Sequence, residues 1–102
     1  MTIYVDRLED WGFIIRGRRV RSCHLFTDGH DIEELHRFAE RIGMRREWFQ
    51  VARSAPHYDL TPSRRAEAVR LGAIEVGRRE AVAIWRARRE VVASGSVGPT
   101  TP

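Results

Sequence analysis

The stretch His57-Tyr58-Asp59-Leu60-Thr61-Pro62-Ser63-Arg64-Arg65 combines a strong helix start with the densest group of chemically capable side chains in the chain. Thr61 caps a first turn and Pro62 fits the first helical position, so a helix is predicted from Pro62 to Gly72. The preceding residues 52–56 read as a loop that delivers His57. An imidazole, a phenol and a carboxylate therefore lie directly before a helix that carries two arginines.

The composition is that of a single globular domain. The chain has 102 residues, of which 42% are hydrophobic and 31% charged, as in ordinary soluble proteins. No apolar run approaches the roughly 20 residues that cross a bilayer, and the N-terminus lacks the pattern of a signal peptide. We expect one domain over residues 1–93, a disordered tail over 94–102 that is small, polar and rich in Gly and Pro, no membrane association and a cytoplasmic location.

All 18 basic residues are arginine, and the chain contains neither lysine nor asparagine. Guanidinium groups bind phosphate and carboxylate well, but a GC-rich genome produces the same bias. The distribution is more informative: residues 1–62 hold ten arginines and ten acids, whereas residues 63–102 hold eight arginines and four acids. The net charge of +4 therefore lies in the C-terminal part. The single cysteine, Cys23, excludes an internal disulfide and is expected to be a buried hydrophobe.

Hydrophobic periodicity predicts the elements of the first half of the chain. Alternation indicates a strand over 2–6 and a β-hairpin over 13–27 with its turn at 17–19. A helix is predicted from the capping residue Asp31 to Gly43, because apolar residues recur at helical spacing between them. A short strand around 48–50 would complete a strand–helix–strand unit whose strands run parallel.

The second half adds the helix from Pro62, a short strand over 74–76 and a last helix over 77–92. The predicted fold class is therefore α/β (or α+β), with a small mixed sheet of four or five short strands and about three helices in one domain.

Five polar residues are candidates for catalysis or metal binding. Asp6, Asp28 and the segment that starts at His57 each follow a predicted strand, and ligands of α/β proteins collect at the carboxyl ends of parallel strands. Asp6 and Asp28 are the candidate metal ligands, since carboxylate and imidazole groups together bind Mg, Mn, Zn or Fe. His57, Asp59 and His24 are the candidate catalytic residues, because imidazole exchanges protons near neutral pH.

Spacing does not identify the chemistry further. The chain contains no His-Glu-x-x-His, Cys-x-x-Cys or Gly-x-Ser-x-Gly motif and no Gly-rich phosphate loop. The cofactor is thus unknown, and a divalent metal stays open. A structural pair that fixes its own loop is the alternative for His57 and Asp59.

The helix that begins at Pro62 offers a phosphate site. The free N–H groups of a first helical turn attract anions, and hydroxyl and guanidinium groups add hydrogen bonds to phosphate. The candidate phosphate-binding residues are Thr61, Ser63, Arg64 and Arg65, together with His36 at the edge of the preceding helix. A capped helix with solvated arginines is the structural alternative. Trp48 and Phe49 are read either as core residues or as a surface on which a base stacks.

Several short motifs follow one another in an order that resembles a known family. They are Ile3-Tyr4-Val5-Asp6, Cys23-His24-Leu25, Asp28, Glu34-Leu35-His36, Trp48-Phe49-Gln50, His57-Tyr58-Asp59-Leu60 and Ser63-Arg64-Arg65-Ala66. Over residues 2–76 the chain resembles the small bacterial and phage proteins called domain of unknown function 4031 (DUF4031). The family is expected to have a second acid where this chain has Arg7, and Ser-Lys-Arg at residues 63–65.

The resemblance carries no established activity, so it assigns no catalytic residues. It implies that His24, His36, His57 and Asp59 belong to one site. The leading expectation is binding of a phosphate-bearing ligand, a nucleotide or nucleic acid, in a pocket of His, Asp and Arg residues. The rivals are a metal-dependent or acid–base phosphoesterase or nuclease, and a small regulatory module whose arginine-lined 77–92 helix binds an acidic protein. Whether the protein is an enzyme, and its oligomeric state, stay open.

Overall fold

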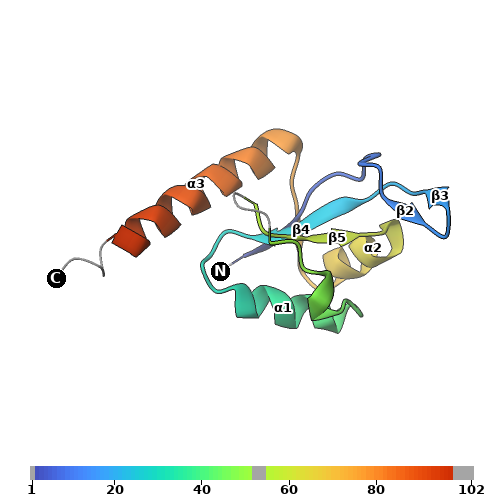
Figure 1. The fold of residues 1–102 in the computed structure, drawn as a ribbon, viewed down its shortest axis with the longest axis horizontal. Helices are drawn as coiled ribbons and strands as arrows, with labels where there is room; N and C mark the ends of the chain where they lie inside the picture. The colour runs from blue at the N-terminus through green and yellow to red at the C-terminus, as the bar shows by residue number, and fades with distance from the viewer. Residues whose placement is uncertain (1, 52–54, 98–102) are drawn as a thin grey trace.

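The computed structural model describes residues 2–51 and 55–97. In this part of the chain four strands form a mixed sheet in the order β5-β4-β1-β6 (Figure 1). β4 is antiparallel to both of its neighbours, and β6 runs parallel to β1. The strands are β1 (Ile3–Val5), β4 (Cys23–Thr27), β5 (Tyr58–Leu60) and β6 (Ile74–Glu75). A small mixed sheet with helices confirms the predicted fold class.

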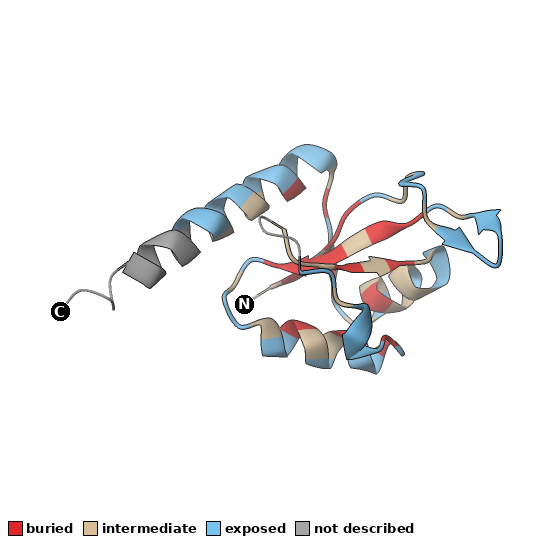
Figure 2. Cartoon of the chain, viewed as in Figure 1, coloured by how far each residue is buried: buried red, intermediate tan, exposed pale blue. Residues whose placement is uncertain are grey.

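Alternation along the strands gives the sheet two different faces, as the two-residue period of a strand requires. One face carries the main core and is covered by α1 (Ile32–Arg41) and α2 (Pro62–Arg70). The other face packs against the first turns of α3 (Arg78–Val97) through a smaller cluster. The main core includes Val5, Cys23, Leu25, Leu35, Ala39, Tyr58, Leu60 and Ala68, and the smaller cluster includes Phe26, Val76, Ala81 and Trp85. Burial is therefore concentrated in the strands (Figure 2).

The helix starts predicted at Asp31 and Thr61 are confirmed, because their caps are local. The side chain of Asp31 accepts a hydrogen bond from Glu33 N, and Thr61 accepts one from Arg64 N. α1 gives way to Gly43, whose φ of +82° is a conformation that glycine adopts without strain.

The predicted hairpin over 13–27 is only partly correct. β2 (Ile14–Ile15) and β3 (Arg18–Arg19) form a two-stranded sheet of their own. The residues between them, Arg16 and Gly17, both have positive φ, as a tight hairpin turn demands. The chain then leaves this hairpin, and β4 pairs with β1 instead.

The strand predicted around residues 48–50 is wrong, and so is the parallel unit built on it. Residues Arg46–Trp48 form the short 3₁₀ helix η1, and the next strand of the sheet is β5. An antiparallel bridge joins Gln50 to His57, and β5 pairs antiparallel with β4.

The last helix extends further than the predicted 77–92. α3 continues to Val97 and runs past the edge of the sheet (Figure 1), so residues 94–97 of the expected disordered tail are helical. Residues 98–102 lie outside the described part of the chain. Within the described residues, no helix is long and apolar enough to cross a membrane.

Candidate functional site

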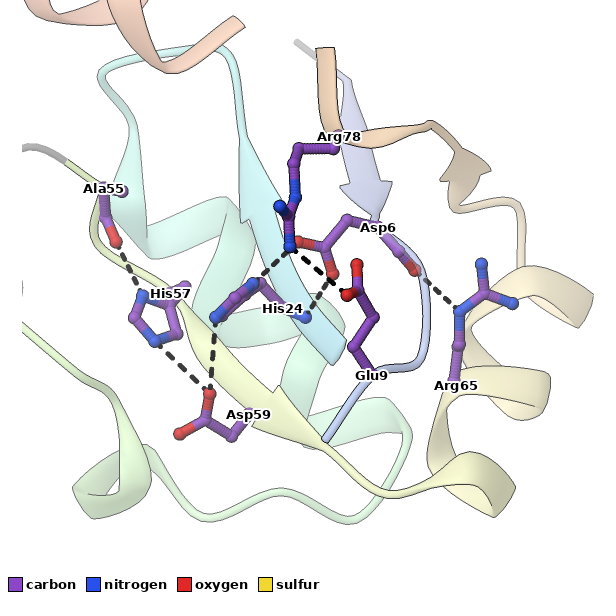
Figure 3. Close-up of polar contacts among 8 residues, drawn as sticks. All are labelled: Asp6, Glu9, His24, Ala55, His57, Asp59, Arg65 and Arg78. Carbon is purple, nitrogen blue, oxygen red and sulfur yellow. Dashed lines mark hydrogen bonds and ion pairs between the residues drawn. The ribbon is translucent and has the colours of Figure 1, made fainter. Parts of the chain in front are cut away.

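The sheet register brings an aspartate and a histidine face to face. His24 of β4 stands directly opposite Asp59 of β5, and Asp6 follows the last residue of β1 beside His24. His57 lies two residues before Asp59 and therefore shares its face of the sheet. Figure 3 shows these four side chains gathered together, and Trp85 of α3 lies beside the His24 ring.

Asp6 fixes the orientation of the His24 ring. One carboxylate oxygen accepts a hydrogen bond from the backbone N of His24 at 2.7 Å, and the other accepts one from its Nδ1 at 2.6 Å. Asp6 is only 5% exposed. Because an ionised carboxylate only accepts hydrogen bonds, the proton of the imidazole resides on Nδ1, and Nε2 points away from Asp6.

His57 is held in the same tautomer by a different acceptor. Its Nδ1 donates to the carbonyl oxygen of Ala55 at 2.6 Å, and its Nε2 lies 3.3 Å from Oδ1 of Asp59. Burial of the ring lowers the pKa of His57, but the contacts with Asp59 and Ala55 outweigh it and the pKa rises above its ordinary value. The contact with His57 in turn lowers the pKa of Asp59.

The imidazoles of His24 and His57 both approach the carboxylate of Asp59. Nε2 of His24 lies 4.0 Å from the same Oδ1 that His57 approaches. One ligand atom from each of His24, His57 and Asp59 lies within 4.8 Å of the others. Two ring nitrogens and an anionic oxygen therefore converge on one point, which suits a proton or a metal cation.

A cavity of about 320 Å³ adjoins the two histidines. Trp11 and Trp85 lie beside the His24 ring, with ring centroids at 5.1 and 5.8 Å. Arg78, at the start of α3, lies over Trp11 at 5.6 Å and donates to Glu9 at 3.2 Å. Asp6, Arg7, Ala55, Ala81 and Val82 complete the lining. The cavity thus combines aromatic and apolar walls with two arginines and the carboxylates of Asp6 and Glu9.

A family of proteins described as "Protein of unknown function (DUF4031)" matches residues 3–88. The chain belongs to this family. The match includes Asp6, His24, His57 and Asp59 and the first turns of α3, and it confirms the resemblance inferred from the short motifs. Neither a curated protein nor a solved structure matches the chain.

In this DUF4031 protein, Arg64 and Arg65 in the first turn of α2 form hydrogen bonds with other residues of the chain. Arg65 donates from Nε to the carbonyl oxygen of Asp6 at 2.8 Å and from Nη1 to Glu75 at 2.9 Å. Arg64 donates to the carbonyl oxygen of Ile42 at 3.2 Å and lies over Trp48. Arg65 therefore holds the end of β1 beside the site, and Arg64 satisfies the end of α1.

The hydroxyl groups of Thr61 and Ser63 lie 3.3 Å apart, and that of Thr61 caps α2. The phosphate-binding role expected for these residues and the two arginines stays a prediction. Binding of an acidic protein to the last helix also stays a prediction. On that helix, Arg88 donates a hydrogen bond to the carbonyl oxygen of Gly29 at 2.9 Å.

The structure does not bring two of the predicted site residues to His24, His57 and Asp59, and the metal-binding role expected for Asp28 and the phosphate-binding role expected for His36 stay predictions. His36 is on α1, which covers the opposite face of the sheet, where its Nδ1 lies 2.6 Å from the hydroxyl of Tyr58. Asp28 follows the far end of β4 and binds the backbone N of Thr2 and the hydroxyl of Tyr4. Because β1 and β4 are antiparallel, Asp6 and Asp28 end up at opposite edges of the sheet.

Trp11, Arg78 and Trp85 line the cavity but were not foreseen as site residues. Two features of the sequence could have indicated them. Trp11 is a tryptophan in a polar connection, and Arg78 and Trp85 are seven residues apart and therefore share one helical face.

Proposed function

We propose that His24, His57 and Asp59 bind a divalent transition-metal ion, and that the protein uses this ion to hydrolyse a phosphate ester. One observation carries the proposal: both imidazoles donate Nδ1–H to a fixed acceptor and aim Nε2 at the same carboxylate. Metal-binding histidines characteristically donate their second N–H to a carboxylate or a backbone carbonyl in this way.

Electrostatics supports a cation at this point. In its neutral form each Nε2 carries a lone pair, and two such lone pairs beside a carboxylate repel one another unless a positive centre lies between them. Two imidazoles and one carboxylate suit Zn²⁺, Mn²⁺ or Fe²⁺ better than the all-oxygen preference of Mg²⁺ or Ca²⁺. Three protein ligands also leave a coordination position for water or substrate, as in catalytic zinc sites.

The surroundings favour a phosphate ester as substrate. An ion held by His24, His57 and Asp59 would supply hydroxide at neutral pH by lowering the pKa of a bound water to about 7. Hydrolysis would consume one water, break the P–O bond to the leaving group and return a proton to the leaving oxygen. Arg7 and Arg78 line the adjacent cavity, where guanidinium groups stabilise the charge of the phosphoryl oxygens.

The raised pKa of His57 favours one alternative. A protonated His57 paired with Asp59 would act as a general acid without a metal. This alternative uses the same residues and predicts activity that persists in a chelator.

Metal titration separates the two functions. The chelator-treated protein is titrated with Zn²⁺, Mn²⁺, Fe²⁺ and Mg²⁺ while heat release and melting temperature are recorded. A bound ion at 100 times its Kd stabilises the fold by about 2.7 kcal/mol. We expect this stabilisation for a transition ion, its loss in His24→Ala and Asp59→Asn, and its retention in His30→Ala, a matched change at an exposed histidine.

Hydrolysis of p-nitrophenyl phosphate and bis-p-nitrophenyl phosphate is then followed with and without the ion. Activity only with the ion supports the metal mechanism. If no ion stabilises the protein, the metal site is refuted, and activity in chelator would assign the acid–base mechanism instead.

A further inference from the structure

The proposed ligands are shared between two cavities. His24 and His57 line the cavity described above, whereas Asp59 lines a second one of about 430 Å³. The second cavity lies between the β2–β3 hairpin and η1, and its walls include Phe13, Ile15, Trp48, Thr61 and Arg64. A group bound at the three ligands would consequently have room on two sides.

Each cavity contains an exposed tryptophan paired with an arginine. Trp11 is 47% exposed with Arg78 over its ring at 5.6 Å, and Trp48 is 42% exposed with Arg64 over its ring at 5.6 Å. Large aromatic rings left this open in a small domain do not contribute fully to its core. A tryptophan beside an arginine is well suited to stack on a nucleobase and to contact the neighbouring phosphate.

We infer that the substrate is a single-stranded nucleic acid, with one base in each cavity and the intervening phosphodiester at His24, His57 and Asp59. The cleavage step rests on the proposed function, but binding of the strand does not require the metal. Hydrolysis consumes one water, breaks one P–O bond of the diester, and leaves a phosphate monoester on one fragment and a hydroxyl on the other.

Three features favour a strand over other phosphate compounds. A mononucleotide would occupy one cavity and leave the second tryptophan–arginine pair unused. A duplex keeps its base faces stacked, whereas both tryptophans require an unstacked base. The net charge of +4 suits a polyanion whose affinity falls as salt is added, and Arg78 and Arg64 lie in the two cavities beside the carboxylates of Glu9 and Glu47.

Binding is measured on the full chain by fluorescence anisotropy of a labelled tetrathymidylate, in chelator and again with the metal. An unlabelled duplex that is long enough to stay paired and thymidine monophosphate serve as competitors, and a tetrauridylate arm tests RNA. We expect the single strands to compete at least tenfold better than either duplex or monophosphate. Trp11→Ala and Trp48→Ala should each weaken binding about tenfold, because one base–aromatic stack is worth about 1–3 kcal/mol.

Matched controls separate stacking from folding. Ile74→Ala removes an exposed apolar side chain from β6, outside both cavities, and should leave binding unchanged. Trp11→Phe and Trp48→Phe keep an aromatic face and should retain most of the affinity. The tryptophan variants should also keep the metal-induced stabilisation of the parent protein.

The outcomes distinguish this inference from the proposed function. Loss of affinity in only one tryptophan variant, or equal competition by the monophosphate, would refute a substrate that spans both cavities while leaving the metal site intact. Strand binding in a protein that no ion stabilises would support the inference and refute metal-dependent hydrolysis.

Discussion

Asp6 is expected to set the metal affinity of the site without being a ligand. Its two oxygens are both committed to His24, one to the backbone N and one to Nδ1. Asp6→Asn keeps an oxygen that can accept the backbone hydrogen bond, but places an amide NH₂ where the second oxygen accepts from the ring. Since an NH₂ group can only donate, His24 must either turn or move its proton to Nε2.

The magnitude follows from the contact that is lost. Hydrogen bonds that involve a charged group contribute about 1.5–3 kcal/mol when buried, and the Asp6 and His24 side chains are only 8% and 16% exposed. We therefore expect Asp6→Asn to lower the free energy of unfolding by about 1.5–3 kcal/mol. Loss of such an orienting partner typically reduces metal affinity by about 10–100-fold.

Urea unfolding of the metal-free protein and calorimetric metal titration measure the two effects separately. Asp28→Asn is the matched control, because Asp28 also accepts a backbone and a side-chain hydrogen bond but lies at the other edge of the sheet. It should leave metal affinity unchanged. Metal affinity in Asp6→Asn equal to that of the parent protein would show that His24 is not a ligand held by Asp6.

Three further predictions concern the pKa of His57, the reactivity of Cys23 and the packing of Leu35. The pKa of His57 is raised in the folded protein, so its ion pair stabilises the metal-free protein fully below the unfolded pKa of about 6.5. This stabilisation is lost as the pH rises through the folded pKa. The difference in unfolding free energy between the parent protein and His57→Gln, measured in urea, should therefore shrink from pH 6 to pH 9. Burial raises the pKa of Cys23 to about 12, so a thiol reagent at pH 8 should react with the urea-unfolded protein and not with the folded one; fast labelling of the folded chain would contradict this. Leu35 is fully buried on the core face of α1, and Leu35→Ala should cost about 2–5 kcal/mol in urea unfolding, whereas Leu71→Ala, at a half-buried site, should cost less.

The sequence predicted the elements whose signals are local. α1 and α2 begin at the expected caps, Asp31 and Thr61, because a cap acts within one helical turn. β5 was missed because its three residues fold as a strand only through pairing with β4. The aromatic segment around Trp48 looked more like a strand than Tyr58–Leu60 did. Pairing between distant segments therefore decided what local propensity could not.

For the candidate site, too, the sequence predicted what depends on residue type and missed what depends on strand pairing. His24, His57 and Asp59 were identified from their chemistry, and the structure brings them together. Asp6 was identified as a ligand, but its oxygens are occupied by His24. Whether a polar residue joins the site depends on register and strand direction, which residue type does not reveal.

The antiparallel register that overturned the predicted topology is what creates the cluster around Asp59. In the predicted parallel arrangement, the residues that follow each strand would meet at one sheet edge, and Asp28 would join Asp6. In the observed sheet, His24 lies near the start of its strand and faces Asp59 directly, while Asp6 reaches it from the end of β1. A slip of one residue between β4 and β5 would send His24 to the core face, because side chains alternate along a strand. The buried Cys23 and Leu25 on either side of His24 oppose this slip, so the hydrophobic core that stabilises the sheet also fixes the geometry of the site.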